Sequence, residues 1–373
     1  ASEKLPKSVA LHIAKGDVAL KAGRVDEAKK EFRAALAIVA NNSLAEFRLG
    51  VAHRRAGEYA IAAQQFDKVG KDDPEFPGLA LERGLLFQEQ GKLDEALKMY
   101  ADALEKAPDD IDLKMRVAST QVISGHPDQA LPLLREVIKK RPQSGEANHF
   151  LGRALLVMGD NAGEALRFLQ SAVQHDPNQA EYHLYVAWAA NETGNLGLAQ
   201  EEIDKALAIN GDLGDAYWQK GVLLQKKGAT RDALEELSIA LEKNPTRFEA
   251  YAAMALCYQD QTQLNLAEDA WRKAVEGNKW VPEWQYRLGV LLFDRGAKDE
   301  AAPFLERAVD LMAERKQTAV WLWKANFLLG ETLRNSDPKR ALTAYEEFMR
   351  LAKSENAYWA DAKAAVEQLK KRP

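Results

Sequence analysis

The chain has little of what most catalytic and metal-binding sites need. Its 373 residues include six histidines and one cysteine, Cys257. A single cysteine excludes an internal disulfide and a cysteine-based metal site. The histidines show no HExxH or other paired spacing, and both a glycine-rich phosphate loop and a GxSxG motif are missing. We therefore expect a protein that is not an enzyme, with no catalytic residue, no metal site and no cofactor. Cys257 lies among Ala253, Met254, Ala255 and Leu256, which favours a buried packing role for its thiol.

An excess of positive charge and long apolar runs are missing as well. Lysine and arginine number 51 against 56 aspartates and glutamates, a net charge of −5. This balance gives no general attraction to nucleic acid or to an anionic membrane, and we expect neither as a partner. No apolar run approaches the roughly 18 residues that span a bilayer. We expect a cytoplasmic protein without direct membrane insertion. A periplasmic location stays open, because the sequence starts at Ala1 and a signal peptide could have been removed.

What the sequence does contain is a repeated pattern of small residues. In residues 77–110 a first helical stretch carries Gly84 and ends at Gly91, and a second carries Ala96 and Tyr100 before Pro108. The small side chains let two helices approach closely, with the Tyr100 ring filling the space beside them, which predicts a helical hairpin. Residues matching Gly84 recur at intervals of 34 or 35, and finally 41, residues: Gly16, Gly50, Gly84, Ala118, Gly152, Ala187, Gly221, Ala255, Gly289 and Gly330. The residue matching Ala96 is alanine in all ten units: Ala28, Ala62, Ala96, Ala130, Ala165, Ala199, Ala233, Ala267, Ala301 and Ala341.

A 34-residue period with these small residues, an aromatic residue and a proline resembles the tetratricopeptide repeat family. The resemblance implies an all-α, right-handed superhelix of about ten helix-turn-helix repeats, whose first helices line a concave groove. We expect an N-terminal extension over residues 1–8, one continuous array of repeats over 9–355, and a capping helix within 356–373. The last interval exceeds the usual one by seven residues in a stretch around 313–324 without glycine or proline. This pattern predicts one or two lengthened helices there.

The resemblance also implies where a partner would bind, because the fifth and ninth residues of each repeat commonly face the groove in this family. These positions give a mostly apolar set of candidate groove residues: Phe47, Leu81, Leu85, Met115, His149, Arg153, Leu184, Trp188, Trp218, Tyr286 and Phe327. The aliphatic members could equally be half-buried packing residues. Trp188 and Trp218 are stronger candidates, because large aromatic side chains concentrate binding energy. His149 and Arg153 lie four residues apart on one helical face and could hold a carboxylate or a carbonyl group.

Two further sets of residues carry a candidate role. The second position of six successive repeats is acidic and would form an acidic rail along the groove: Asp112, Glu146, Glu181, Asp215, Glu249 and Glu283. The competing interpretation is that these carboxylates stabilise helix N-termini. Trp321 and Trp323 lie two apart on an expected helix, so that one of them should be exposed and form a second contact site. The competing interpretation is that both are buried.

These features predict a scaffold or adaptor that binds a peptide or helical segment of a partner protein in its groove. Three alternatives remain open from the sequence. The chain could be the repeat region of a larger enzyme or signalling protein, a periplasmic assembly or polysaccharide-export component, or a structural homo-oligomer.

Overall fold

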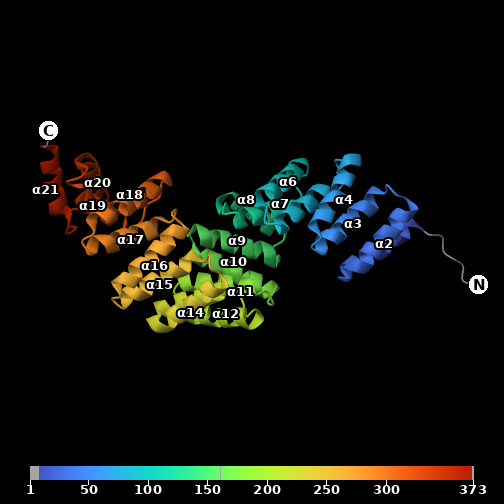
Figure 1. The fold of residues 1–373 in the computed structure, drawn as a ribbon, viewed down its shortest axis with the longest axis horizontal. Helices are drawn as coiled ribbons and strands as arrows, with labels where there is room; N and C mark the ends of the chain where they lie inside the picture. The colour runs from blue at the N-terminus through green and yellow to red at the C-terminus, as the bar shows by residue number, and fades with distance from the viewer. Residues whose placement is uncertain (1–7, 160, 372–373) are drawn as a thin grey trace, which may run out of the picture. The chain divides into compact units, whose positions relative to one another are not determined.

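A computed structural model describes residues 8–159 and 161–371. All regular structure in these residues is α-helical, which confirms the predicted all-α repeat fold (Figure 1). The helices group into two compact parts, residues 1–177 and 178–373, which are described separately here. Of the expected N-terminal extension only Ser8 is described, and its hydroxyl accepts a hydrogen bond from the amide of Leu11 in the first helix. The expectation of one continuous array over 9–355 stays a prediction.

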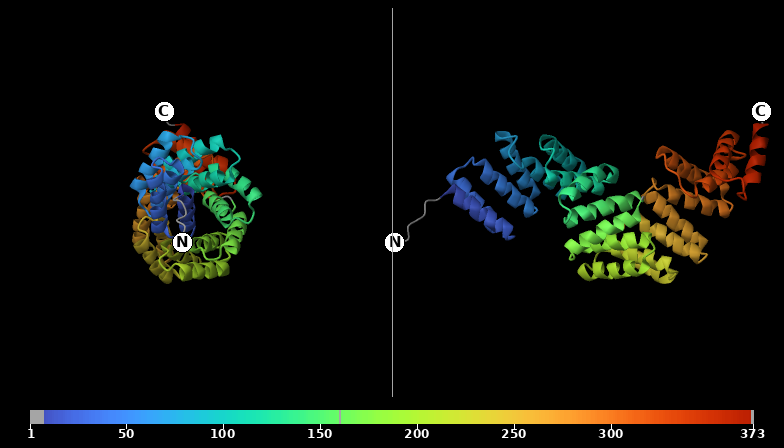
Figure 2. Two further views of the ribbon diagram at one scale, coloured as in Figure 1. Left: turned by 90° about the vertical axis from the view of Figure 1, so that its right-hand side faces the viewer. Right: turned by 180° about the vertical axis from the view of Figure 1, so that it is seen from behind.

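Within each part the helices form consecutive antiparallel hairpins, and neighbouring hairpins pack side by side (Figure 2). The first part contains α1 (Val9–Lys21), α2 (Val25–Ile38), α3 (Ser43–Arg55), α4 (Tyr59–Asp72), α5 (Leu79–Glu89), α6 (Leu93–Lys106), α7 (Ile111–Ile123), α8 (Pro127–Lys140), α9 (Gly145–Met158) and α10 (Ala162–His175). The second part contains α11 (Ala180–Glu192), α12 (Leu196–Ile209), α13 (Gly214–Lys226), α14 (Thr230–Lys243), α15 (Phe248–Asp260), α16 (Leu264–Gly277), α17 (Pro282–Asp294), α18 (Lys298–Glu314), α19 (Leu322–Leu333), α20 (Pro338–Leu351) and α21 (Trp359–Lys370). Odd-numbered helices up to α19 are thus the first helices of the repeats, and even-numbered helices are the second.

The core of each hairpin is built from the residues that recur in the sequence. All ten matched alanines are fully buried. Four residues after each of them, one turn further along the second helix, stands a large side chain that is at most 1% exposed: Phe32, Phe66, Tyr100, Leu134, Leu169, Ile203, Leu237, Trp271, Leu305 and Tyr345. In the seven repeats whose small residue is glycine, this side chain lies directly against that glycine of the first helix. Each such burial stabilises the fold by roughly 1.5–3 kcal/mol, which a hairpin obtains only with its partner helix in place.

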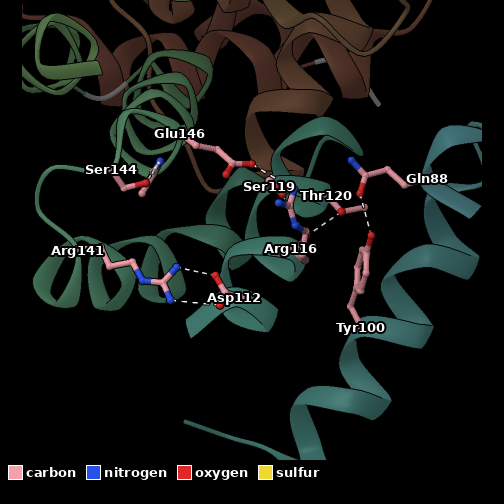
Figure 3. Close-up of polar contacts among 10 residues, drawn as sticks. Gln88, Tyr100, Asp112, Arg116, Ser119, Thr120, Arg141, Ser144 and Glu146 are labelled. Carbon is pink, nitrogen blue, oxygen red and sulfur yellow. Dashed lines mark hydrogen bonds and ion pairs between the residues drawn. The ribbon is translucent and has the colours of Figure 1, made fainter. Parts of the chain in front are cut away.

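The largest core side chains keep their polar atoms satisfied. The hydroxyl of Tyr100 donates to Gln88 at 3.0 Å, and the indole of Trp271 donates to the equivalent Gln259 at 3.1 Å (the first pair is drawn in Figure 3). In both repeats the acceptor lies on the first helix, one turn beyond the small residue. A buried ring with a polar group is therefore accommodated without an unpaired donor.

The turn inside most hairpins depends on a residue with positive φ. Glycine supplies it in eight repeats, as at Gly91 and Gly228, where left-handed backbone is sterically cheap. The repeat of α15 and α16 has Thr262 at this position, with φ of 58°. A β-branched residue pays about 1–2 kcal/mol for this conformation, so this turn is the strained member of the series.

The inserted residues before Gly330 make a longer helix and a loop. α18 has 17 residues, three more than α16, and ends at Glu314. Lys316 then takes a positive φ of 53°, and the amides of Lys316 and Gln317 bond to carbonyl groups in the last turn of α18. This left-handed stop ends the helix without glycine. Residues 315–321 precede α19, so the prediction of lengthened helices alone is only half right.

The C-terminal helix covers the last hairpin as expected. α21 buries Ala362, Ala365, Val366 and Leu369, and its first residue Trp359 packs against a ring of α20. Among the described residues, no helix combines the length and apolar character needed to cross a bilayer.

Candidate functional site

The second part contains a pocket on the first helices of four successive repeats. Its volume is about 210 Å³. It is lined by residues of α11, α13, α15 and α17 together with one residue of α16: Trp188, Glu192, Trp218, Gln219, Val222, Glu249, Ala252, Ala253, Leu256, Trp271, Glu283, Trp284 and Arg287. We call this site the tryptophan pocket. The repeat period places it there, because equivalent positions of neighbouring first helices face the same way.

Four tryptophans form most of the aromatic surface of this pocket. The rings of Trp188 and Trp218 meet edge to face, with centroids 5.2 Å apart and 76° between their planes. Trp218 is only 6% exposed and Trp271 only 1%, whereas Trp188 and Trp284 are half-buried. Trp188 and Trp284 therefore supply the indole surface that a bound group can reach.

The charged groups in the pocket and beside it divide into firmly and loosely paired ones, and Arg247 with Asp215 is a firm pair beside it. Arg247 donates to Asp215 through Nε at 2.9 Å, and its guanidinium lies 4.9 Å from the centre of the Trp218 ring. Burial alone lowers the pKa of Arg247, but the hydrogen bond and charge of Asp215 outweigh it, so the pKa lies above its usual value. Arg287 is held in the same way by Glu283, at 2.7 Å.

Two carboxylates of the pocket are paired only at long distance. Glu249 lies 3.6 Å from Arg247, and Glu192 lies 3.4 Å from the ammonium of Lys226. Lys226 makes its short hydrogen bond elsewhere, to the carbonyl group of Asn191 at 2.6 Å. The pocket therefore presents two loosely paired carboxylates, Glu192 and Glu249, beside the half-buried rings.

The predicted groove residues are less exposed than their positions suggested. Six are buried: Phe47, Met115, His149, Leu184, Trp218 and Phe327. Five are half-buried: Leu81, Leu85, Arg153, Trp188 and Tyr286. The buried members pack between neighbouring helices, as Phe47 does against Phe66 and Phe76. Of the eleven, Trp188 and Trp218 line the tryptophan pocket, and Leu81 lines a pocket of about 320 Å³ in the first part. Their role in binding stays a prediction.

The predicted pair of His149 and Arg153 does not present two groups to solvent. His149 is 1% exposed, and its ring meets Phe150 edge to face. The guanidinium of Arg153 lies 5.9 Å from the centre of the same Phe150 ring. Helical spacing put the two side chains on one face correctly, but packing against neighbouring helices covers the imidazole.

The acidic rail is accompanied by arginines along its length. Arg141 donates to Asp112 at 2.5 and 3.2 Å and holds the pKa of that carboxyl below its usual range, and Arg116 donates to Glu146 at 3.2 Å (Figure 3). In the second part Asp215 and Glu249 face Arg247, and Glu283 faces Arg287. Glu181 also has an interaction partner. The six carboxylates do lie in the first turns of their helices, so the helix-terminal role holds beside these ion pairs.

The exposure of Trp321 and Trp323 differs from the prediction. Trp321 is the N-cap residue of α19 and Trp323 lies in its first turn; both are half-buried. Trp321 stacks on Tyr286, with ring centroids 4.6 Å apart and 12° between planes, and Trp323 lies 6.2 Å from the Tyr358 ring. The prediction that one of the two is exposed is therefore wrong, because both are half-buried and each has an aromatic neighbour. Their role as a second contact site stays a prediction. The adjacent Val320 is 90% exposed instead.

These contacts also cover two predicted groove positions. Trp321 stacks on Tyr286, and Tyr358 stacks on Phe327 at 4.5 Å. Both covering rings come from segments that connect hairpins, not from the first helices themselves. Aromatic residues of the chain itself thus lie against these two predicted groove positions.

A family model described as tetratricopeptide repeat matches residues 13–80, 47–111, 118–180 and 252–315. These segments together span more than half of the chain. The chain belongs to the tetratricopeptide repeat family. The resemblance seen in the recurring small residues is confirmed, and the small residue, alanine and large side chain of each hairpin form the core of the tetratricopeptide repeats described above.

The relatives of this chain within the family have different names and match different shares of the chain. The TPR repeat-containing protein YpiA of Bacillus subtilis is 21% identical over 294 residues, which cover 78% of this chain and 68% of YpiA. The photosystem I assembly protein Ycf3 of Prochlorococcus marinus is 30% identical over 122 residues, which cover 30% of this chain and 68% of Ycf3. The chain spans about half the length of two further curated relatives. Human IFIT1, solved as a dimer with m7Gppp-AAAA, is similar in fold, with a TM-score of 0.62, 19% identity and coverage of 99% of this chain and 92% of IFIT1.

The pocket residues that the repeat positions did not predict include Glu192, Trp284 and Arg287. Trp284 and Arg287 lie three residues apart, and Glu283 precedes Arg287 by four, so all three share one face of α17. Glu192 follows Trp188 by four residues on α11. Helical spacing around the predicted Trp188 and Glu283 would have found them.

The only cysteine provides a test of core packing. Cys257 is fully buried, and burial raises the pKa of its thiol to about 12. At pH 8 the thiolate fraction is then about 10⁻⁴, against roughly 0.2 for an exposed cysteine. We expect the native chain to react with Ellman's reagent at least about 100-fold more slowly than the urea-unfolded chain. Similar rates in both states would show that α15 does not bury this thiol.

Proposed function

We propose that this chain is a protein-binding scaffold without catalytic function that holds a segment of a partner protein in the tryptophan pocket. The observation that carries the proposal is that the half-buried Trp188 and Trp284 line one cavity together with the buried Trp218. Rings of this kind dominate protein interfaces, because they bury a large area at a small cost in side-chain entropy.

The size of the pocket favours a side chain over a small molecule. Pockets for drug-sized ligands and cofactors usually measure about 300–1,000 Å³. At about 210 Å³ the tryptophan pocket is smaller. It suits one anchoring side chain, with the rest of the partner segment extending along the first helices.

The charges favour a protein partner over RNA, although the fold-similar IFIT1 was solved with a capped oligonucleotide. Three carboxylates and one guanidinium line the pocket, and that guanidinium, on Arg287, is paired with Glu283. Sites for single-stranded RNA combine stacking rings with an excess of lysine and arginine. The relative Ycf3 is a photosystem I assembly protein, which is consistent with a scaffold function.

Selection of random peptides displayed on phage tests the proposal. The intact chain serves as bait, and a Trp188→Ala, Trp284→Ala double variant serves as the counter-bait. We expect enriched peptides that bind the intact chain and not the variant. Peptides that bind both baits equally, or tighter binding of a single-stranded RNA oligonucleotide than of any selected peptide, would contradict it.

A further inference from the structure

The tryptophan pocket combines accessible indole rings with two carboxylates, Glu192 and Glu249, whose ion pairs are long. Trp188 is half-buried, and Glu192 follows it by four residues on the same face of α11. Glu249 enters the same pocket from α15. Lys226 pairs with Glu192 at 3.4 Å and Arg247 pairs with Glu249 at 3.6 Å, both longer than the 2.7 Å ion pair of Arg287 with Glu283 in the same pocket.

Two tryptophans of this pocket already contact arginines of the chain itself. The guanidinium of Arg247 lies 4.9 Å from the Trp218 ring centre, and that of Arg287 lies 6.0 Å from the Trp271 ring centre. Each of these arginines is also held by its own carboxylate. The recurring unit is thus an indole face, a guanidinium and a carboxylate, an arrangement in which cation–π attraction and an ion pair act together.

Trp188 with Glu192 and Glu249 supplies the ring and the carboxylates of this unit, while Lys226 and Arg247 pair with these carboxylates only at longer distance. We propose that the tryptophan pocket binds the cationic side chain, arginine or lysine, of an incoming protein segment. The cation stacks on Trp188 and pairs with Glu192 and Glu249. This inference rests on the proposed scaffold function and names the side chain that anchors the partner.

The lining charge agrees with such a ligand. Glu192, Glu249 and Glu283 face one arginine, so the pocket carries an excess of negative charge before a ligand binds. An aliphatic anchor would bury Glu192 and Glu249 with only their long ion pairs to compensate the lost hydration, which costs free energy. A cation satisfies them and uses the indole face.

The probes are N-acetyl-arginine amide and its uncharged isostere N-acetyl-citrulline amide, each added to the full chain labelled with 5-fluorotryptophan. ¹⁹F NMR resolves the eight tryptophans, and Trp188→Phe and Trp284→Phe variants assign the pocket signals. We expect the arginine probe to shift the Trp188 signal with a Kd on the order of 10 mM, which is the weak binding that one cation–π contact and an ion pair provide. The citrulline probe should bind at least about fivefold more weakly.

The controls come from the same chain. Trp280 is 52% exposed, but its ring already faces Lys279 and Arg307, so its signal should not move. Glu192→Gln and Glu249→Gln should each weaken binding of the arginine probe about two- to fivefold, and Glu242→Gln, exposed and outside the pocket, should not.

Equal shifts from arginine and citrulline, or no shift of Trp188 with either probe, would overturn the inference. The proposed function is judged separately by the phage selection. Peptides that depend on Trp188 and Trp284 but carry no arginine or lysine would preserve the scaffold and reject the cationic anchor.

Discussion

Replacing Gly84 with alanine is expected to destabilise the chain by about 1–3 kcal/mol, although alanine favours helix more than glycine does. A Cβ atom at Gly84 would lie 2.2 Å from the nearest atom of the Tyr100 ring. Tyr100 is fully buried, and its hydroxyl is held by Gln88, so the ring has no free direction in which to move. The measurement is the urea midpoint of unfolding followed by circular dichroism.

The next repeat indicates a second substitution that should restore the stability lost in Gly84→Ala. There the small residue is Ala118 and the large residue is Leu134, and both are fully buried. Tyr100→Leu in the Gly84→Ala background recreates this pair. It should restore at least half of the decrease in the urea midpoint that Gly84→Ala causes. Gly197→Ala is the control, because a Cβ atom there would lie 4.0 Å from the only neighbouring atom, and it should not destabilise. A Gly84→Ala chain as stable as the original would contradict the packing of this core.

The second large effect is expected at the tryptophan pocket. Trp188→Ala with Trp284→Ala should weaken a phage-selected peptide by about 2–4 kcal/mol, roughly 30- to 1,000-fold in Kd, because the peptide loses the reachable indole surface. Isothermal titration calorimetry measures the loss. Since both side chains are half-buried, the helical circular dichroism signal should change little.

The choice of these two tryptophans follows from their burial. Trp218 is 6% exposed, so Trp218→Ala would open a cavity and cost about 3–5 kcal/mol of stability, which would obscure a binding effect. Trp280→Ala is the matched control, since it removes a more exposed indole of the same part outside the pocket. A loss of affinity in the Trp280 variant equal to that in the double variant would assign the peptide to another surface.

The repeat core could be predicted from the sequence because one geometric need recurs in every hairpin. Ala96 and its nine counterparts are fully buried, as their fixed spacing from the small residue of the first helix requires. The stop after α18 could not be predicted in the same way. It depends on Lys316 in a left-handed conformation, which neither its side chain nor its neighbours indicate.

The groove was predicted only in part, because side-chain packing decides which positions stay reachable. Position in the repeat identified Trp188 correctly as pocket lining. Phe327 lines a different pocket, of about 350 Å³, in which Tyr358 stacks on its ring. The ion pairs between the carboxylates of the acidic rail and arginines could not be predicted from the sequence either. Arg247 lies 32 residues from Asp215, and only the stacking of neighbouring repeats brings the two together.

Photo-crosslinking tests the central claim, that the first helices of residues 178–373 hold the partner segment at the tryptophan pocket. A selected peptide carrying a diazirine next to its anchoring residue is bound to the intact chain, irradiated and mapped by mass spectrometry. We predict crosslinks to α11, α13, α15 and α17, lost in the Trp188→Ala, Trp284→Ala double variant. Crosslinks confined to the second helices α12, α14 and α18, or to residues 8–159, would contradict it.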